Sequence, residues 1–183
     1  MLYGILGVVA VLFLAFIGIY NKLAKLKVMV EEASSDIETF LKQRYDMIPN
    51  LVEIVKGYAK HEQETFEKVT AARTGAISAQ NINEQLAAEN ILSGALKSLF
   101  AVAEAYPELK ANTNFLELQS QFTDTEDKIS FARQFYNDTV QKFNTKIELF
   151  PFNLIAGFLG FEMVSYYSLG PSSSERDSLK INF

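Results

Sequence analysis

The chain has 183 residues and a formal net charge of -5, with 17 basic and 22 acidic side chains. It contains no cysteine, which excludes disulfides, zinc fingers and cysteine-held iron–sulfur clusters. No dense run of Lys and Arg stands out, so we expect no binding of nucleic acid. With only four prolines and nine glycines, long uninterrupted helices are permitted.

The first twenty residues, Met1 to Tyr20, carry no ionisable side chain other than tyrosine. At a rise of 1.5 Å per residue, such a helix covers roughly 30 Å, the hydrocarbon thickness of a bilayer. The sequence therefore predicts a transmembrane helix over residues 1–20, with the lipid bilayer as a partner. A secretory signal peptide is the alternative, but a positively charged start and a small-residue cleavage site are both missing.

Residues that flank the predicted span indicate its orientation. Tyr3 and Tyr20 lie near its two ends, where aromatic rings with a polar tip prefer the headgroup level. Lys22, Lys25 and Lys27 follow directly and form a positive flank on the C-terminal side. By the positive-inside rule, we expect a single-pass plasma-membrane protein with its N-terminus outside and its large domain in the cytoplasm.

Residues 21–73 predict one very long amphipathic helix, kinked near residue 49. Apolar side chains recur there at steps of three and four, namely Leu23, Leu26, Val30, Ala33, Ile37, Phe40, Leu51, Val55, Tyr58, Phe66 and Val69. Pro49 removes one backbone donor and crowds the carbonyl of Tyr45. The alternative is a true break at Asp46, with Asp46 capping a new helix.

After a turn-prone stretch, two further helices are predicted over residues 84–106 and 113–150. The first has apolar positions at Ala88, Leu92, Ala95, Leu99, Val102 and Tyr106, and ends before Pro107. The second has Phe115, Leu118, Phe122, Thr125, Ile129, Ala132, Tyr136, Phe143, Ile147 and Phe150 on one stripe. So long a seam suits a coiled coil or a helical bundle, and its Phe and Tyr side chains favour the bundle.

Residues 152–168 are almost wholly apolar but too short for a second span. They predict a short fourth helix that closes the bundle, or a segment that docks on a membrane surface or a partner. The apolar positions in question are Phe152, Leu154, Ile155, Phe158, Leu159 and Phe161. Residues 170–183 are Ser-rich and charged, and they predict a disordered tail.

Together these elements predict an all-α fold: an N-terminal transmembrane helix followed by an up-and-down, antiparallel four-helix bundle over residues 21–169. Polar side chains near the apolar stripes predict a structural polar cluster between the first and third bundle helices. Its expected members are Arg44, Asp46, Asn50, Arg133, Asn137 and Asn144. A ligand pocket at the same residues is the alternative.

Residue patterns typical of catalysis or metal binding are missing from the sequence. The one histidine, His61, lacks the Glu three residues before it that a di-iron bundle needs, and the second histidine of a zinc site. There is no glycine-rich phosphate loop, no G-x-S-x-G turn and no Cys–His pair. We therefore expect no catalytic, cofactor-binding or metal-binding residues, and no enzyme.

Four stretches of the sequence carry a family resemblance, namely QRYDMIPNLVEIVKGYAKHE at residues 43–62, ENILSGALKSLFAVAEAYPELKAN at 89–112, FARQFYND at 131–138 and NTKIELFPFNLIAGFLGF at 144–161. In this order they resemble the LemA family of bacterial membrane proteins. The resemblance implies one N-terminal transmembrane helix, a short extracytoplasmic N-terminus and a cytoplasmic four-helix bundle. It implies no reaction and supplies no catalytic residue.

The function expected from these features is that of a membrane-anchored scaffold or adaptor that acts through protein–protein interaction. A homo-oligomer is the preferred form, because seams continued from a membrane anchor let copies pack side by side, and other membrane proteins are further candidate partners. The alternative from another class is a small-anion or metal sensing domain built around Arg44 and Arg133.

Overall fold

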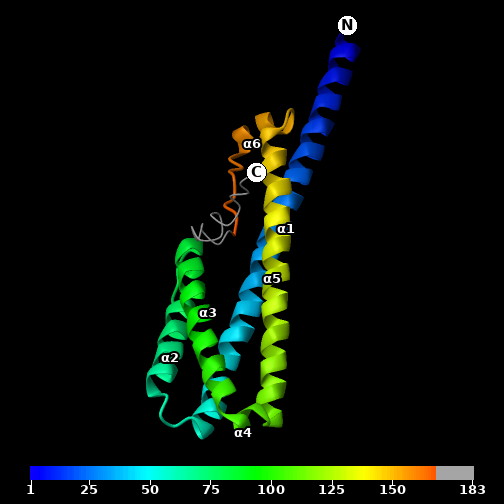
Figure 1. Cartoon of the computed structure of the whole chain (residues 1–183). Helices are drawn as coiled ribbons and strands as arrows, with labels where there is room; N and C mark the ends of the chain where they lie inside the picture. The colour runs from blue at the N-terminus through cyan, green and yellow to red at the C-terminus, as the bar shows by residue number, and fades with distance from the viewer. Residues whose placement is uncertain (168–183) are drawn as a thin grey trace, which may run out of the picture. The chain divides into compact units, whose positions relative to one another are not determined.

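A computed structural model describes residues 1–167 of the chain, and every regular element among them is a helix. The helices are α1 (Leu2–Tyr58), α2 (Gln63–Ile77), α3 (Ile82–Ala105), α4 (Pro107–Lys110), α5 (Thr113–Glu148) and α6 (Phe152–Leu159) (Figure 1). This confirms the all-α fold with a very long first helix. The tail predicted for residues 170–183 lies outside the described residues.

The helices divide into two compact units. Unit 1 holds residues 1–39 and 129–166, and unit 2 holds residues 40–128 together with Tyr167. Both α1 and α5 contribute one part to each unit.

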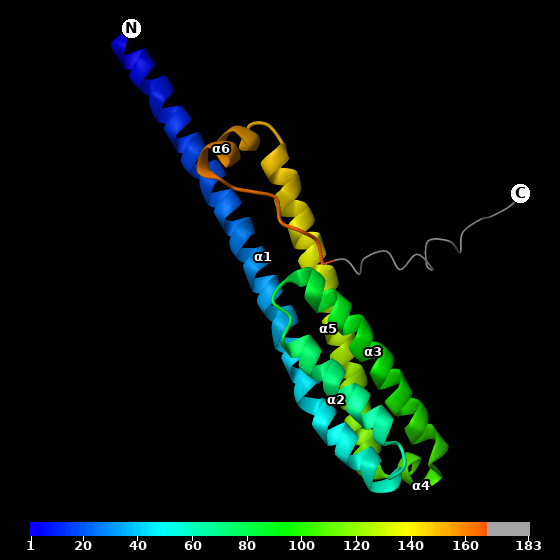
Figure 2. The ribbon, with the colours of Figure 1, turned by 90° about the vertical axis from the view of Figure 1, so that its left-hand side faces the viewer.

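Unit 2 is built from four helical segments: the C-terminal part of α1, then α2, α3 and the first part of α5. Consecutive segments run in opposite directions, and α2 lies along α3 (Figure 2). Its interior is apolar, with fully buried Leu51, Val55, Val69, Leu92 and Leu99. Phe100 of α3 meets Phe122 of α5 edge-on, with ring centroids 5.5 Å apart.

The first helix ends earlier than the apolar spacing predicts. The structure places the turn at residues 59–62, where α1 has ended and α2 has not begun, so one helix over residues 21–73 is wrong, as is a break at Asp46. The apolar spacing gave no sign of this turn, because the buried residues on its two sides, Ala59 and Phe66, lie seven residues apart. Seven residues are two helical turns, so the apolar stripe keeps its phase across the turn.

Pro49 is tolerated inside α1 because a side chain replaces the donor that it lacks. Proline has no N–H, so the carbonyl oxygen of Tyr45 has no partner one turn later in the helix. Arg73 of α2 donates its Nε–H to this oxygen at 2.7 Å. Pro49 itself is exposed, so its ring causes no clash in the core.

Side chains at the helix starts explain the remaining turns of unit 2. Asn81 caps α3 by accepting the backbone N–H of Glu84 at 3.0 Å, and the Glu84 carboxylate accepts the N–H of Gln80 at 3.0 Å. Pro107 opens the one-turn α4, where a missing N–H costs nothing. Asn112 accepts the N–H of Phe115 at 3.0 Å at the start of α5.

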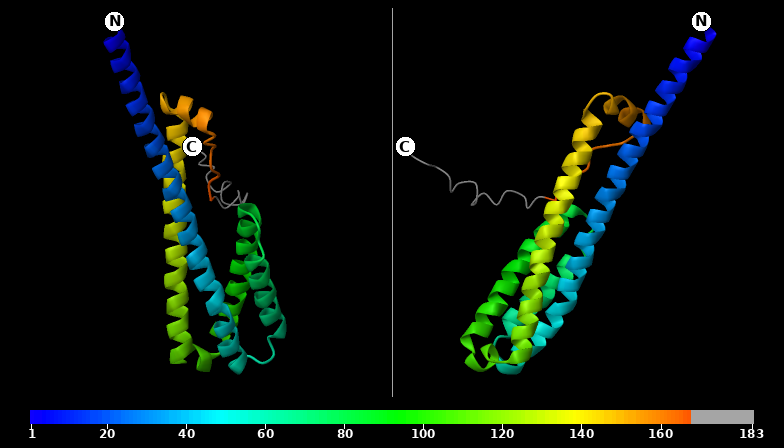
Figure 3. Two further views of the ribbon diagram at one scale, coloured as in Figure 1. Left: turned by 180° about the vertical axis from the view of Figure 1, so that it is seen from behind. Right: turned by 90° about the vertical axis from the view of Figure 1, so that its right-hand side faces the viewer.

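Unit 1 contains the N-terminal part of α1, the C-terminal part of α5, α6 and an extended segment over residues 161–166 (Figure 3). Nearly all side chains from residue 1 to residue 20 are exposed, although most are large and apolar. By length and composition, α1 is therefore a candidate membrane span, with none of its most apolar stretch buried. α3 passes the same test, but a third of its stretch is buried, as in a core helix.

The helix predicted over residues 152–168 is only half as long in the structure. α6 ends at Leu159 because Gly160 adopts a left-handed backbone with φ 71°, a conformation that favours glycine. The chain then continues extended, and Tyr167 belongs to unit 2. The four-helix arrangement of unit 2 includes α2 and not α6. The prediction that residues 152–168 supply its last helix is therefore wrong.

We expect Arg73→Met to lower the free energy of unfolding by about 1–3 kcal/mol, because the carbonyl of Tyr45 loses its donor. In a Pro49→Ala background the new backbone N–H of residue 49 satisfies that carbonyl, so the same substitution should cost less than about 1 kcal/mol. Guanidinium unfolding of the full chain in mild detergent, followed by circular dichroism, measures the difference. An equal cost in both backgrounds would contradict the assignment.

Candidate functional site

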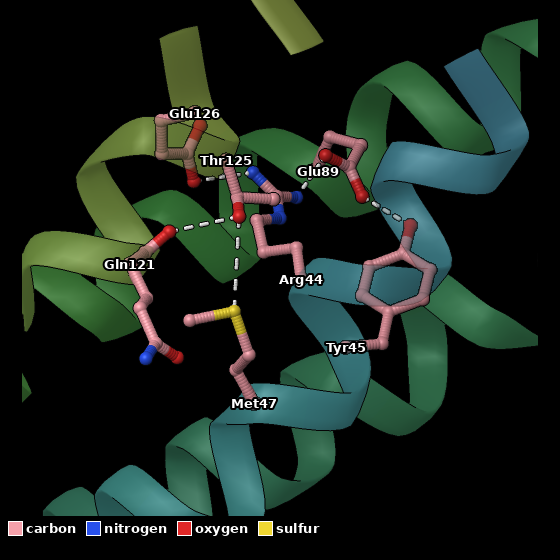
Figure 4. Close-up of polar contacts among 7 residues, drawn as sticks. All are labelled: Arg44, Tyr45, Met47, Glu89, Gln121, Thr125 and Glu126. Carbon is pink, nitrogen blue, oxygen red and sulfur yellow. Dashed lines mark hydrogen bonds and ion pairs between the residues drawn. The ribbon is translucent and has the colours of Figure 1, made fainter. Parts of the chain in front are cut away.

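A buried arginine links three helices of unit 2. Arg44 of α1 is only 1% exposed and forms ion pairs with Glu89 of α3 and Glu126 of α5. Its Nη2 donates to Glu89 Oε2, and its Nη1 donates to Glu126 Oε1 at 2.8 Å. Figure 4 shows the three side chains pointing toward one another from their separate helices.

Glu89 is held on both of its oxygens. Its Oε2 accepts from Arg44, and its Oε1 accepts from the hydroxyl of Tyr45, the next residue on α1 (Figure 4). Burial, the hydrogen bond to Glu89 and the charge of that carboxylate all raise the pKa of the Tyr45 hydroxyl. Tyr45 therefore keeps its proton throughout the physiological range and remains a donor to Glu89.

The cluster contains one cation and two carboxylates, which differ in their exposure to solvent. Burial alone lowers the pKa of Arg44, but the charges of Glu89 and Glu126 outweigh it, so the pKa is raised above its ordinary value. Glu89 is buried at 2% exposure, whereas the Glu126 side chain is 39% exposed and partly screened by water. Arg44 Nε is buried and finds no acceptor within residues 1–167. Arg44 and Glu89 thus form a buried ion pair, and Glu126 adds a second carboxylate that reaches the surface.

A smaller polar contact lies beside the ion pairs. The hydroxyl of Thr125 is 2.8 Å from the carbonyl oxygen of Gln121 and 3.8 Å from the sulfur of Met47 (Figure 4). Both Thr125 and Met47 are buried, and the hydroxyl is satisfied by its own helix. This contact therefore adds packing between α1 and α5 in unit 2 without a free polar group.

The six residues of the predicted polar cluster are divided between the two units. Arg44, Asp46 and Asn50 belong to unit 2, and only Arg44 is buried, since Asp46 and Asn50 are exposed. Asn50 instead lines a shallow groove between α1 and α5, together with Asn114 and Gln121. The other three, Arg133, Asn137 and Asn144, lie on α5 in unit 1, the first two half-buried and Asn144 buried.

Asn144 has a specific role within unit 1. Its Nδ2 donates to the carbonyl oxygen of Val164 at 2.8 Å, and its Oδ1 accepts the backbone N–H of Val164 at 3.0 Å. The hydroxyl of Tyr136 donates to the carbonyl oxygen of Ser165 at 3.0 Å. These bonds hold the extended segment after α6 against α5, a second reason why the helix stops at Leu159.

Sequence reasoning missed both carboxylates that pair with Arg44. The buried face of α3 consists of Leu86, Glu89, Leu92, Leu96, Leu99 and Ala103. Of the apolar positions predicted for this helix, only Leu92 and Leu99 lie on the buried face. The prediction assigned Ala88 to the core, whereas the structure buries the next residue, Glu89. A charged residue at helical spacing between Leu86 and Leu92 was the signal, because a buried acid needs a basic partner.

The ion pairs of Arg44 bear on the alternative of an anion or metal sensor. An anion would have to compete with Glu89 and Glu126, which already neutralise the guanidinium. Among residues 1–167 no group of three or more His, Asp or Glu side chains could hold a metal ion. No observation in this part of the chain favours the sensor.

The remaining predicted residues lie in unit 1. Lys22, Lys25 and Lys27 are all exposed on α1. The apolar residues of the segment after Pro151 separate into two groups: Leu154, Phe158 and Leu159 are exposed, whereas Phe152, Ile155 and Phe161 are half-buried. The second group packs inward, since Phe161 meets the rings of Tyr20 and Phe143 at centroid distances of 6.4 Å and 6.3 Å.

Comparison with known proteins identifies the family. The model of the LemA family matches residues 33–183. The chain belongs to the LemA family. Protein LemA of Metamycoplasma hominis is 27% identical over 164 residues, which cover 87% of this chain and 73% of that protein.

Other LemA-like relatives are magnetosome proteins. MamQ 1 and MamQ 2 of Paramagnetospirillum magneticum are each 23% identical over 179 residues, covering 84% of this chain. The chain spans 66% of the length of each. The chain is thus a LemA-family protein, and its N-terminal apolar helix is a candidate membrane anchor.

We expect Arg44→Met to lower the free energy of unfolding by about 3–5 kcal/mol, because it leaves the Glu89 carboxylate buried without its cation. Arg44→Met combined with Glu89→Leu should recover most of the loss, since neither charge is then buried alone. Lys68→Met is the matched control: it breaks an exposed pair with Glu64 and should change little. Guanidinium unfolding in mild detergent measures all three variants, and a double variant as unstable as Arg44→Met would refute the pairing.

Proposed function

We propose that this LemA-family protein is a membrane-anchored scaffold or adaptor that acts through protein–protein interaction, first of all by self-association. The observation that carries the proposal is an exposed aromatic pair on α5. Phe131 and Phe135 are 76% and 51% exposed and lie one helical turn apart, so they share a face of the helix. Neither ring packs against an aromatic neighbour among the described residues.

The anchor is the N-terminal part of α1. Residues 2–20 cross the bilayer as one helix, because their apolar side chains are exposed and their length matches the hydrocarbon thickness. Lys22, Lys25 and Lys27 place the following residues on the cytoplasmic side of the bacterial plasma membrane.

A second copy of the chain is the occupant that fits the aromatic pair. Two rings from each copy bury on the order of 500 Å² together, less than the 1,200 Å² or so of a stable interface in solution. Anchoring compensates for the small area, because it confines the copies to one plane and presents α5 of each at the same depth. Other membrane proteins that display an apolar helix at this depth are further partners.

The orientation predicts which side of the membrane a label reaches. The chain has no cysteine, so a single Asn50→Cys gives one thiol on the exposed side of α1. In intact bacterial cells a membrane-impermeant maleimide should leave this thiol unlabelled, and permeabilisation should expose it. A cysteine in a short extension added before Met1 is the control and should react in intact cells, whereas labelling of residue 50 from outside would reverse the orientation.

Self-association is tested by crosslinking between copies in membranes. Gln134→Cys places a thiol beside the aromatic pair on an exposed position of α5, and oxidation should yield a disulfide-linked dimer. Adding Phe131→Glu and Phe135→Glu should lower the dimer fraction at least about tenfold, since like charges then face one another. Ile91→Glu, a charge at a 65% exposed position of α3, is the control and should leave the dimer unchanged. Equal dimer fractions for Gln134→Cys alone, with the two Phe→Glu substitutions and with Ile91→Glu would show that the aromatic pair is not the contact.

A further inference from the structure

Unit 1 contains a groove whose walls come from α1 and α5. Its volume is about 520 Å³, and four lysines line it: Lys22 and Lys25 from α1, and Lys142 and Lys146 from α5. The rest of its lining is mostly apolar and includes Leu26, Met29 and Leu149. The groove therefore combines four positive charges with an apolar lining, although its two walls lie more than a hundred residues apart in sequence.

Among residues 1–167, none of the four lysines of this groove forms an ion pair with a carboxylate, so this part of the chain does not neutralise their charge. Two of them lie over an aromatic ring instead: Lys22 and Lys146 are 5.9 Å and 4.8 Å from the centroid of Phe152 at the start of α6. The Phe152 ring thus holds one ammonium group from each wall, and the four like charges stay close together without an anion.

The groove begins where the candidate membrane span ends. Lys22 is two residues after Tyr20, and Lys25 is five, which is about 8 Å along the helix axis. The headgroup layer on each side of a bilayer is roughly 5–8 Å thick. Lysines at this distance from the apolar segment therefore lie at the level of lipid phosphates.

α6 lies at the same level and turns apolar side chains outward. Phe161, two residues after the end of α6, contacts Tyr20 at the end of the apolar segment, at 6.4 Å between ring centroids. Ala156 faces inward, whereas Phe150, Leu154 and Phe158 are 78%, 65% and 82% exposed. Large apolar side chains exposed beside a basic groove are typical of helices that lie in the membrane interface.

We propose that this groove binds an anionic phospholipid of the surrounding membrane, with its phosphate among Lys22, Lys25, Lys142 and Lys146 and α6 embedded in the headgroup layer. The inference rests on the proposed membrane anchor and adds a lipid specificity to it. The apolar lining receives the upper part of an acyl chain, which a free phosphate ion does not have. The lipid phosphate offsets one of the four positive charges and fastens α5 and α6 to the membrane near the anchor.

Native mass spectrometry of the full chain in mild detergent tests the lipid site. The probes are phosphatidylglycerol and phosphatidylcholine with the same acyl chains, and inorganic phosphate. A lysine near an anionic headgroup strengthens binding about fivefold, so we expect one phosphatidylglycerol to be retained at least about tenfold more strongly than phosphatidylcholine. Inorganic phosphate should not be retained. Equal retention of both lipids, or retention of phosphate alone, would overturn the proposal.

Two sets of substitutions separate the groove from general charge. Replacing Lys22, Lys25, Lys142 and Lys146 by Gln should abolish the preference for phosphatidylglycerol. Replacing four exposed lysines of unit 2, Lys56, Lys60, Lys68 and Lys97, removes the same charge and should leave the preference within about twofold. Circular dichroism confirms that both variants keep their helices. If the preference for phosphatidylglycerol survived the groove substitutions, or was lost with the unit 2 substitutions, the proposed lipid site would be wrong.

A fluorescent probe tests the depth of α6 independently. The chain has no tryptophan, so Phe158→Trp gives a single tryptophan on α6, whose emission can be excited selectively over that of the tyrosines. In phosphatidylglycerol vesicles, lipids brominated near the headgroup should quench it. Phe131→Trp, fifteen residues before Lys146 on α5 and so roughly 22 Å farther along the helix, should not be quenched. Unquenched emission from the Phe158→Trp variant would show that α6 does not lie in the membrane.

Alkaline carbonate washing of membranes distinguishes failure of the inference from failure of the anchor. A chain that stays with the membrane but shows no lipid preference keeps its anchor and overturns the groove. A chain that washes off overturns both.

Discussion

A guanidinium enclosed by apolar side chains must meet carboxylates before the helices around it can close, and unit 2 is organised around this requirement. Arg44 obtains its partners from α3 and α5, which are separate in sequence. Sliding α3 by one turn would leave Glu89 buried without its cation, at a cost of several kcal/mol, and sliding α5 would remove the second carboxylate from Arg44. The cluster therefore selects one register among those that the apolar core alone would accept.

A second arginine of unit 2 supplies a hydrogen-bond donor that the backbone of α1 lacks. Pro49 interrupts the hydrogen bonding of α1, and Arg73 restores a donor from the neighbouring helix. Both arginines thus hold α1 through polar atoms, Arg44 with its own side chain and Arg73 through the carbonyl oxygen of Tyr45. Tyr45 belongs to both arrangements, because its hydroxyl contacts Glu89 while its carbonyl accepts from Arg73.

Much of the fold follows from the sequence, and the exceptions have physical causes. The α5 stripe was predicted almost completely, because buried Phe115, Phe122, Ile129 and Phe143 repeat at helical spacing over one unbroken helix. The turn after Tyr58 could not be seen, since the apolar phase continues through it. Of the site, Arg44 was recognised but its partners were not: apolar periodicity identifies core positions, whereas ion pairing between helices depends on the tertiary arrangement. Gly160 gave only a weak signal, because glycine within an apolar run does not by itself end a helix.

The two hydrogen bonds between the Asn144 amide and Val164 engage the backbone of Val164 and not its side chain. An amide that pairs with both the N–H and the carbonyl of one residue imitates a neighbouring β-strand, so the path of that segment is set by main-chain atoms. Positions 162–165 are then free to diverge in sequence, provided that Asn144 is kept and no proline replaces Val164. Substitutions at these positions in a related protein would then change the surface that the segment presents to other molecules. They would leave its path along α5 unchanged.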